Sequence, residues 1–205
     1  MTELDPSIEV DILERLPTPF GLVRYGVAPD HELTKNVMST FHDVALRENV
    51  TYRGNVELGK DVSLQQLQHL YSAVVIATGA SSDRALGLDK EKNVNVIPAR
   101  HFVNWYNGHP NFVDYMERNK VISLSEVTDV VVVGNGNVAL DCARILLKST
   151  DALKSTDIVP SCVTALAASS VKNVHIIGRR SHVQNFTNPI LNPNPNHSHP
   201  YQPHP

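Results

Sequence analysis

Two glycines stand directly behind a run of valines, in a pattern that suits the binding of a diphosphate. Val130–Val133 is followed by Gly134, Gly136 and Ala139, which gives the order strand, GxGxxA, helix. The first glycine permits a tight turn, the second lacks a Cβ that would block the phosphates, and the alanine lets the helix pack closely on the sheet. Free N–H groups at the helix start then face the phosphates. We interpret the segment as a dinucleotide-binding turn; a purely structural glycine turn is the alternative.

The choice between NAD and NADP depends on the end of the next predicted strand. A ribose 2′-hydroxyl is usually bound by Asp or Glu, whereas a 2′-phosphate needs cations. Here Gly178 is followed by Arg179 and Arg180, with no acid beside them. Charge-assisted hydrogen bonds from guanidinium groups contribute roughly 1.5–3 kcal/mol each, so the pair favours NADP. The arginines lie farther past the turn than the usual ~20 residues, which an insertion at 149–171 explains; an arginine pair at a solvated strand end is the alternative.

The first third of the chain carries a second, looser set of residues that suits a nucleotide. Glu14 closes an apolar strand, where an acid binds ribose hydroxyls in dinucleotide folds. The proline-rich loop Pro17–Leu22 follows it, and Ala77–Ala80 ends another apolar run with small residues that let a ligand approach the backbone. Taken singly, each feature has an ordinary explanation: a surface acid, a stiff connection, a strand-end glycine.

Hydrophobic patterns predict the elements that position these residues. Apolar runs indicate strands at 8–14, 50–58 (a strand or a hairpin around Gly54-Asn55), 72–78, 129–133 and 172–177. Periodicity and caps predict helices at 32–47, 63–71 with Ser63 as N-cap, 99–106, 138–148 and within 158–170. We expect the strands at 72–78 and 129–133 to be buried, and Val37, Phe41, Val44 and Ala45 to form one buried helical stripe. The alternation of strands and helices indicates an α/β fold with a parallel sheet.

Composition excludes several classes of protein. A formal net charge of −3 over 205 residues gives no general attraction for nucleic acid. The two cysteines, Cys142 and Cys162, have no zinc-site spacing and argue against a disulfide scaffold. The apolar runs are too short for a transmembrane segment, and no targeting peptide is visible at the start. A histidine cluster at 197–204 is interpreted as part of a polar tail, so we expect no metal site.

Several longer motifs resemble the adrenodoxin-reductase type of ferredoxin–NADP reductases. The resemblance covers about residues 8–184 in order, and its motifs are long and specific. Those motifs are Leu16–His31, Lys35-Asn36-Val37, Gly54–Glu57, Phe102–Gly108, Gly134–Leu147 and Ile177–Arg180.

The resemblance implies two nucleotide cofactors, FAD and NADP, and roles for individual residues. By this likeness Glu14, Leu22 and Leu58 would contact FAD, and Arg179 with Arg180 would bind the 2′-phosphate. The catalytic candidates are His31 and Asp141, near the flavin and the nicotinamide; Asp141 also suits an ordinary acid in a first helical turn. The NADP pyrophosphate would be held by Gly134, Asn135, Gly136, Asn137 and Val138.

The same likeness suggests two Rossmann-like units of which the first is incomplete. Residues 1–80 would be a partial FAD-binding domain without the family's first strand and its GxGxxG turn, and 81–181 an NADP-binding domain incomplete at its end. Residues 182–205, rich in Pro, Asn and His, should be disordered. We expect a truncated chain that binds FAD poorly by itself.

The leading hypothesis is a flavoprotein oxidoreductase that passes electrons from NADPH through FAD to a ferredoxin- or adrenodoxin-type iron–sulfur protein. The resemblance implies a mitochondrial, matrix-side location, peripheral to the inner membrane. One alternative is a non-catalytic NADP-binding fragment. Another is a module like the glutamate-synthase small subunit, which the loop Gly26–His31 disfavours.

Overall fold

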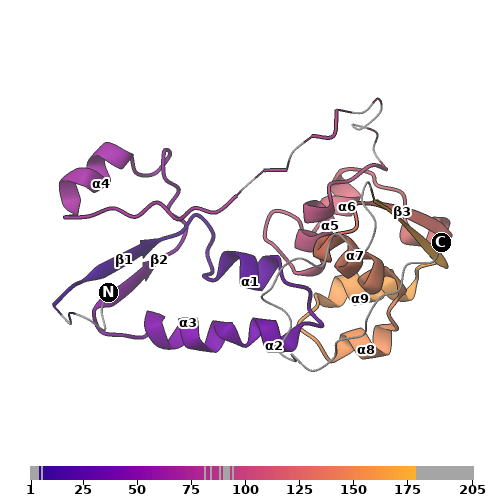
Figure 1. Cartoon of the computed structure of the whole chain (residues 1–205), viewed down its shortest axis with the longest axis horizontal. Coiled ribbons are helices and arrows are strands. Elements are labelled where there is room, and N and C mark those ends of the chain that lie inside the picture. The colour runs from indigo at the N-terminus through magenta and orange to yellow at the C-terminus, as the bar shows by residue number, and fades with distance from the viewer. Residues whose placement is uncertain are drawn as a thin grey trace, which may run out of the picture.

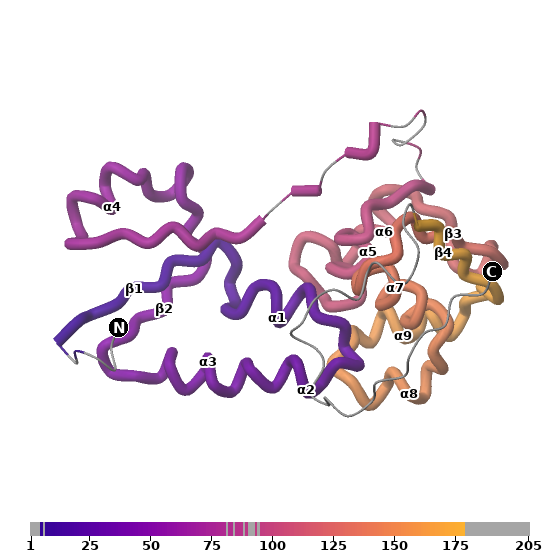
Figure 2. Tube along the Cα trace, in the orientation of Figure 1, coloured from indigo at the N-terminus to yellow at the C-terminus, as the bar shows by residue number. Residues whose placement is uncertain are grey.

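A computed structural model describes residues 5, 7–80, 82–83, 85–87, 89, 93 and 95–178 of the chain. Within them, two parallel strand–helix–strand units follow one another (Figure 1). The path of the chain in Figure 2 shows the first unit in one half of the molecule and the second in the other. The predicted α/β class is confirmed. The predicted domain limits stay a prediction, and the tail at 182–205 lies outside the described residues.

The first unit pairs β1 (Val10–Leu13) with β2 (Val50–Arg53), and Val10 lies opposite Val50. Three helices connect these strands, and α4 follows them; Figure 1 draws α3 and α4 on opposite sides of the strand pair. The two strands run in the same direction, so they need a crossover connection, which is usually helical. The helices are α1 (Gly21–Tyr25), α2 (Glu32–Lys35), α3 (Val37–Ala45) and α4 (Leu64–Leu70).

Two predictions for the helix after β1 need correction. The single helix at 32–47 is divided at Asn36 into α2 and α3, and α3 has no buried residue: Val37 is 37% and Phe41 is 42% exposed. Of the two alternatives predicted for 50–58, the strand is confirmed as β2. No hairpin forms at Gly54-Asn55, because Asn55 N and Val56 N instead donate to the carbonyls of Leu16 and Glu14, at 3.2 and 3.0 Å.

The segment 72–78, predicted as a buried strand, has no strand structure, and Val75 and Ile76 are 74% and 61% exposed. A strand forms only beside a partner that accepts and donates its ladder hydrogen bonds, and no described strand pairs with this segment. The N-cap prediction is confirmed: Ser63 and Gln66 form a reciprocal capping box at the start of α4.

The second unit pairs β3 (Asp129–Val133) with β4 (Asn173–Ile177). Both strands and the helix that follows β3 agree with the predicted ranges. The prediction that β3 is buried is wrong, since Val131 and Val133 are 55% and 65% exposed. Exposure alternates along β3, so the strand is partly covered on one face, and α7 contacts both β3 and β4. The connection contains α7 (Asn137–Leu147), α8 (Thr150–Lys154) and α9 (Pro160–Ala167).

The core of this half lies among its helices. Tyr106, Ile145 and Leu153 are fully buried, and burial of side chains of this size contributes about 1.5–3 kcal/mol each. The cluster joins α5 (Ala99–Tyr106) to α7, α8 and α9, while α6 (Tyr115–Arg118) and the short 3-10 helix Leu124–Glu126 lie beside it. The packing therefore fixes α7, which is the helix that begins at the glycine turn. No helix in the described part of the chain is long and apolar enough to span a membrane.

Candidate functional site

The glycine turn has the geometry that its sequence predicts. Gly134 has a φ of 122°, a left-handed value that side chains disfavour, and its N–H donates to the Ile177 carbonyl at 2.8 Å. Gly136 is the N-cap of α7 and has extended backbone. A Cβ built on Gly136 would meet no described atom within 4 Å, and no described side chain caps the helix. The turn thus leaves an open, uncapped helix N-terminus.

The residues named for the pyrophosphate surround this opening. Asn137 and Val138 form the first turn of α7, and Val138 is 49% exposed. A Cβ on Gly178 would lie only 2.5 Å from Asn135 Cγ, so the Asn135 side chain packs against the residue that follows β4. The chain therefore leaves β4 beside the turn. Arg179 and Arg180 come next in the sequence but lie outside the described residues.

On the flavin side, Glu14 stands at the end of β1, as predicted. Its N–H donates to the Arg53 carbonyl at 3.0 Å, and its Oε1 accepts from Leu16 N at 3.0 Å. No described residue is hydrogen-bonded to the other carboxylate oxygen. Leu22 and Leu58 are 79% and 39% exposed. Figure 1 draws β1 and α7 in separate halves of the molecule, so the two predicted cofactor regions do not coincide.

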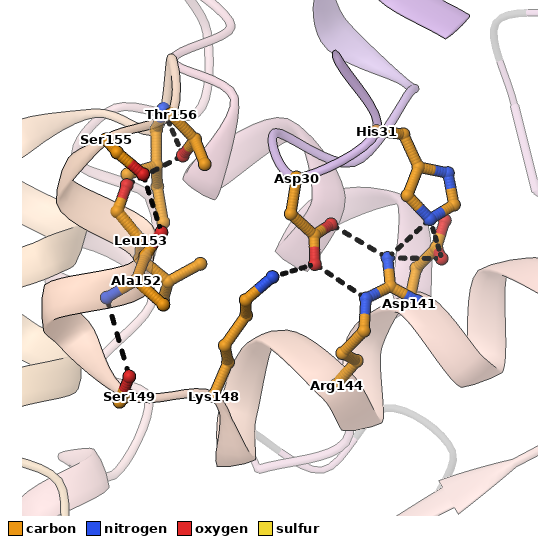
Figure 3. Close-up of polar contacts among 11 residues, drawn as sticks. Asp30, His31, Asp141, Arg144, Lys148, Ser149, Ala152, Leu153, Ser155 and Thr156 are labelled. Atoms are coloured by element: carbon orange, nitrogen blue, oxygen red, sulfur yellow. Dashed lines mark hydrogen bonds and ion pairs between the residues drawn. The ribbon is translucent and has the colours of Figure 1, made fainter. Parts of the chain in front are cut away.

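The two catalytic candidates come together through a residue that the sequence analysis missed. His31 Nε2 lies 3.8 Å from Asp141 Oδ1. Arg144 Nη2 stands between them, 2.9 Å from His31 Nε2 and 2.8 Å from Asp141 Oδ1 (Figure 3). The same guanidinium binds Asp30, whose carboxylate also accepts from Lys148 Nζ at 2.9 Å.

The ion pairs of this network link the loop before α2 to α7 and its C-cap. The side chain of Asp30 is only 4% exposed. Hydrogen bonds from Arg144, and then from Lys148, outweigh burial and hold the pKa of Asp30 well below its usual range. The hydrogen bonds that Arg144 donates to Asp30 also raise the pKa of Arg144. The spacing of Asp141, Arg144 and Lys148 on one helical face is visible in the sequence, but nothing in it indicates the distant Asp30.

A second set of contacts that the sequence does not predict joins the two halves of the molecule. The buried Lys35 at the end of α2 donates to both carboxylate oxygens of Asp157, at 2.9 and 2.7 Å, and to Asn107 Oδ1 at 3.0 Å. Asn107 Nδ2 in turn donates to the Tyr25 carbonyl at 3.2 Å. A buried ammonium is costly unless it is paired and hydrogen-bonded, and here Lys35 has both kinds of partner. Among the described residues, no group of His, Cys, Asp and Glu side chains is arranged to hold a metal ion.

The sequence has close relatives among curated proteins. It is 51% identical over 175 residues to the mitochondrial NADPH:adrenodoxin oxidoreductase of Arabidopsis thaliana, and 44% identical over 179 residues to that of Homo sapiens. These alignments cover 85% and 87% of this chain but 35% of each relative, so the chain spans about a third of the curated relatives it matches. The resemblance predicted from the motifs is confirmed.

Solved structures agree with this relationship. The structure of Mycobacterium tuberculosis FprA in complex with NADPH matches with a TM-score of 0.80 and 44% sequence identity, covering 86% of this chain and 38% of that one. A second FprA structure matches with a TM-score of 0.82 and 41% identity. The family match itself extends over residues 11–193. With its glycine turn, its fold and its sequence in agreement, the chain belongs to the pyridine nucleotide-disulphide oxidoreductase family.

Proposed function

We propose that this chain forms the NADPH-binding part, and a portion of the FAD-binding part, of a flavoprotein oxidoreductase that reduces a ferredoxin- or adrenodoxin-type iron–sulfur protein. The observation that carries the proposal is Gly136, which stands open to solvent at the uncapped start of α7. Backbone N–H groups at such a helix start bind phosphate oxygens, and the helix dipole favours their charge. The solved structure of a relative in complex with NADPH supports the same assignment.

The proposed NADP site consists of the turn and the end of β4. Gly134, Asn135, Gly136, Asn137 and Val138 would hold the pyrophosphate. Arg179 and Arg180 would pair with the 2′-phosphate, since guanidinium groups match phosphate oxygens in charge and shape. The position of Gly178 against Asn135 supports this, because it brings the chain past the turn just before the two arginines.

The proposed FAD contacts are Glu14, Leu22 and Leu58. Glu14 fits a ribose because it lies at the carboxyl end of a parallel strand with a carboxylate oxygen not bonded to described residues. When bound, FAD supplies the redox chemistry that connects a two-electron donor to a one-electron acceptor. The chain's residues would bind and orient the two nucleotides. We extend the mitochondrial location named for the relatives to this chain, on the matrix side.

A titration with NADPH tests the nucleotide site. Gly136→Val should weaken NADPH binding at least tenfold, which corresponds to about 1.4 kcal/mol, because the new side chain would occupy the phosphate position. The matched double variant Arg179→Gln/Arg180→Gln should weaken NADPH binding by a similar factor and leave NADH binding unchanged. Circular dichroism of each variant checks the fold. Equal affinity of the wild-type chain for NADPH and NADH would overturn the assignment of the arginines.

Electron transfer needs a separate measurement. Reduction of cytochrome c in the presence of NADPH, FAD and an added ferredoxin should proceed for an enzyme and fail for a chain that only binds NADP. NADPH binding without cytochrome c reduction would support the non-catalytic alternative for the 205-residue chain.

A further inference from the structure

Arg144 is within hydrogen-bond distance of His31 as well as Asp30, through its Nη2 atom. This nitrogen has three acceptors within hydrogen-bond distance: Asp30 Oδ1 and Asp141 Oδ1 at 2.8 Å, and His31 Nε2 at 2.9 Å. An Nη2 group carries two hydrogens. One completes the pair with Asp30, and the other is shared between Asp141 and His31, which lie on the same side of the guanidinium in Figure 3.

The chemistry of arginine determines which atom is the donor in the hydrogen bond between Arg144 and His31. A guanidinium is always protonated and has no acceptor, and its bonds to Asp30 raise the pKa of Arg144 further. A proton on His31 Nε2 would therefore place two N–H groups against each other at 2.9 Å. Asp141 Oδ1, at 3.8 Å, is too far away to accept a normal hydrogen bond from that nitrogen. Nε2 must accept, so the ring proton belongs on Nδ1.

We propose that Arg144 is a positioning residue that fixes His31 as the neutral tautomer with its proton on Nδ1. The hydrogen bond made by one ring nitrogen determines which tautomer a histidine adopts. The second ring nitrogen lies on the far side of the ring from Arg144 (Figure 3), and the His31 side chain is 43% exposed. Among the residues that the structure describes, Nδ1 has no hydrogen-bond partner.

His31 is thereby prepared to donate a hydrogen bond from Nδ1 to an acceptor oxygen of a ligand. This role rests on the proposed nucleotide-binding function, whereas the tautomer itself is a property of the chain without nucleotide. The charged groups around the ring are Asp30 from the same loop and Asp141 and Arg144 from α7, with Lys148 held on Asp30. Arg144 is the one among these four that contacts Nε2 within hydrogen-bond distance.

Nitrogen NMR of the 205-residue chain labelled at histidine tests the proposal. Long-range proton–nitrogen spectra distinguish the two neutral tautomers, because Nε2 couples to both ring protons and Nδ1 to one. The spectra should be recorded near pH 8.5, well above the ordinary imidazole pKa of about 6.5. The His31 signals are assigned by their loss in His31→Gln. In the wild-type chain, Nε2 of His31 should resonate as the unprotonated nitrogen.

Two substitutions, one on α7 and one at its C-cap, form a matched pair for this test. Arg144→Met removes the donor, so His31 should lose its preference for the Nδ1-protonated tautomer. Its nitrogen signals should then resemble those of exposed histidines such as His42 and His69. Lys148→Met also removes a cation from Asp30. Because Lys148 does not contact His31, the tautomer of His31 should stay unchanged in this variant. A wild-type His31 protonated on Nε2, or an Arg144→Met variant that keeps the proton on Nδ1, would overturn the proposal. Failure of the wild-type chain to bind NADPH would contradict the proposed function but not the tautomer.

Discussion

The carboxylate of Asp30 and the guanidinium of Arg144 form a two-pronged ion pair. Arg144 Nε lies 2.7 Å from Oδ2, and Nη2 lies 2.8 Å from Oδ1. The pair joins a loop in the first half of the chain to α7, the helix that begins at the glycine turn. It therefore connects the proposed flavin side with the proposed NADPH side, and its removal should affect stability as well as His31.

Arg144→Met should lower the free energy of unfolding by about 1–3 kcal/mol, because a buried carboxylate would lose its bidentate partner. Lys148 would still pair with Asp30 and limit the loss. Urea unfolding can be followed by the fluorescence of Trp105, the single tryptophan of the chain and a buried one. Arg118→Met is the control, since the Arg118–Asp114 pair is more than half exposed and exposed pairs contribute about 0–1 kcal/mol. Equal losses in the two variants would contradict the importance of the buried pair.

The stability that the ionised Asp30 contributes should decrease as the pH falls. Its folded-state pKa lies well below the usual value of about 3.9, because Arg144 and Lys148 favour the charged form. A depressed folded pKa gives stability that is fully present above the unfolded pKa and is lost as the pH falls toward the folded pKa. The difference in unfolding free energy between wild type and Asp30→Asn should thus shrink below about pH 4. A difference that stays constant from neutral pH to pH 3 would show that the ionised form is not favoured.

The two glycines of the turn should respond differently to alanine. Gly134→Ala places a side chain at a φ of 122°, and such strained backbone costs about 1–3 kcal/mol. Gly136 has ordinary extended backbone and open space around its Cβ position. Gly136→Ala should therefore change stability by no more than about 1 kcal/mol. Thermal unfolding of both variants gives the comparison, and a larger loss at Gly136 than at Gly134 would contradict the observed turn.

The two cysteines should be unreactive in the folded chain. Burial raises the pKa of Cys142 to about 11 and that of Cys162 to about 12. The thiolate is the reactive form, so alkylation by iodoacetamide near pH 8 should be at least about 100-fold slower than for free cysteine. Mass spectrometry before and after unfolding in urea measures this ratio. Rapid alkylation of either residue under native conditions would show that α7 or α9 opens readily.

Local patterns were sufficient for much of the second half. The runs at 129–133 and 172–177, the glycine turn and the helix after it are defined by the nearest residues in sequence, because turn chemistry and helix starts are short-range effects. Ser63 and Gln66 illustrate the same point, since a capping box needs only four consecutive residues. The family motifs were equally readable, because each is a short continuous segment.

Tertiary structure decided what depends on distant partners. The run at 72–78 has the composition of a buried strand, yet it remains exposed without a described neighbour to share hydrogen bonds. Asp30 and Arg144 are 114 residues apart in sequence, so their pairing follows from how the loop before α2 packs near α7. The sequence alone determined that a glycine turn opens α7; only the fold determined which cation contacts His31, because that contact requires two segments far apart in sequence to come together.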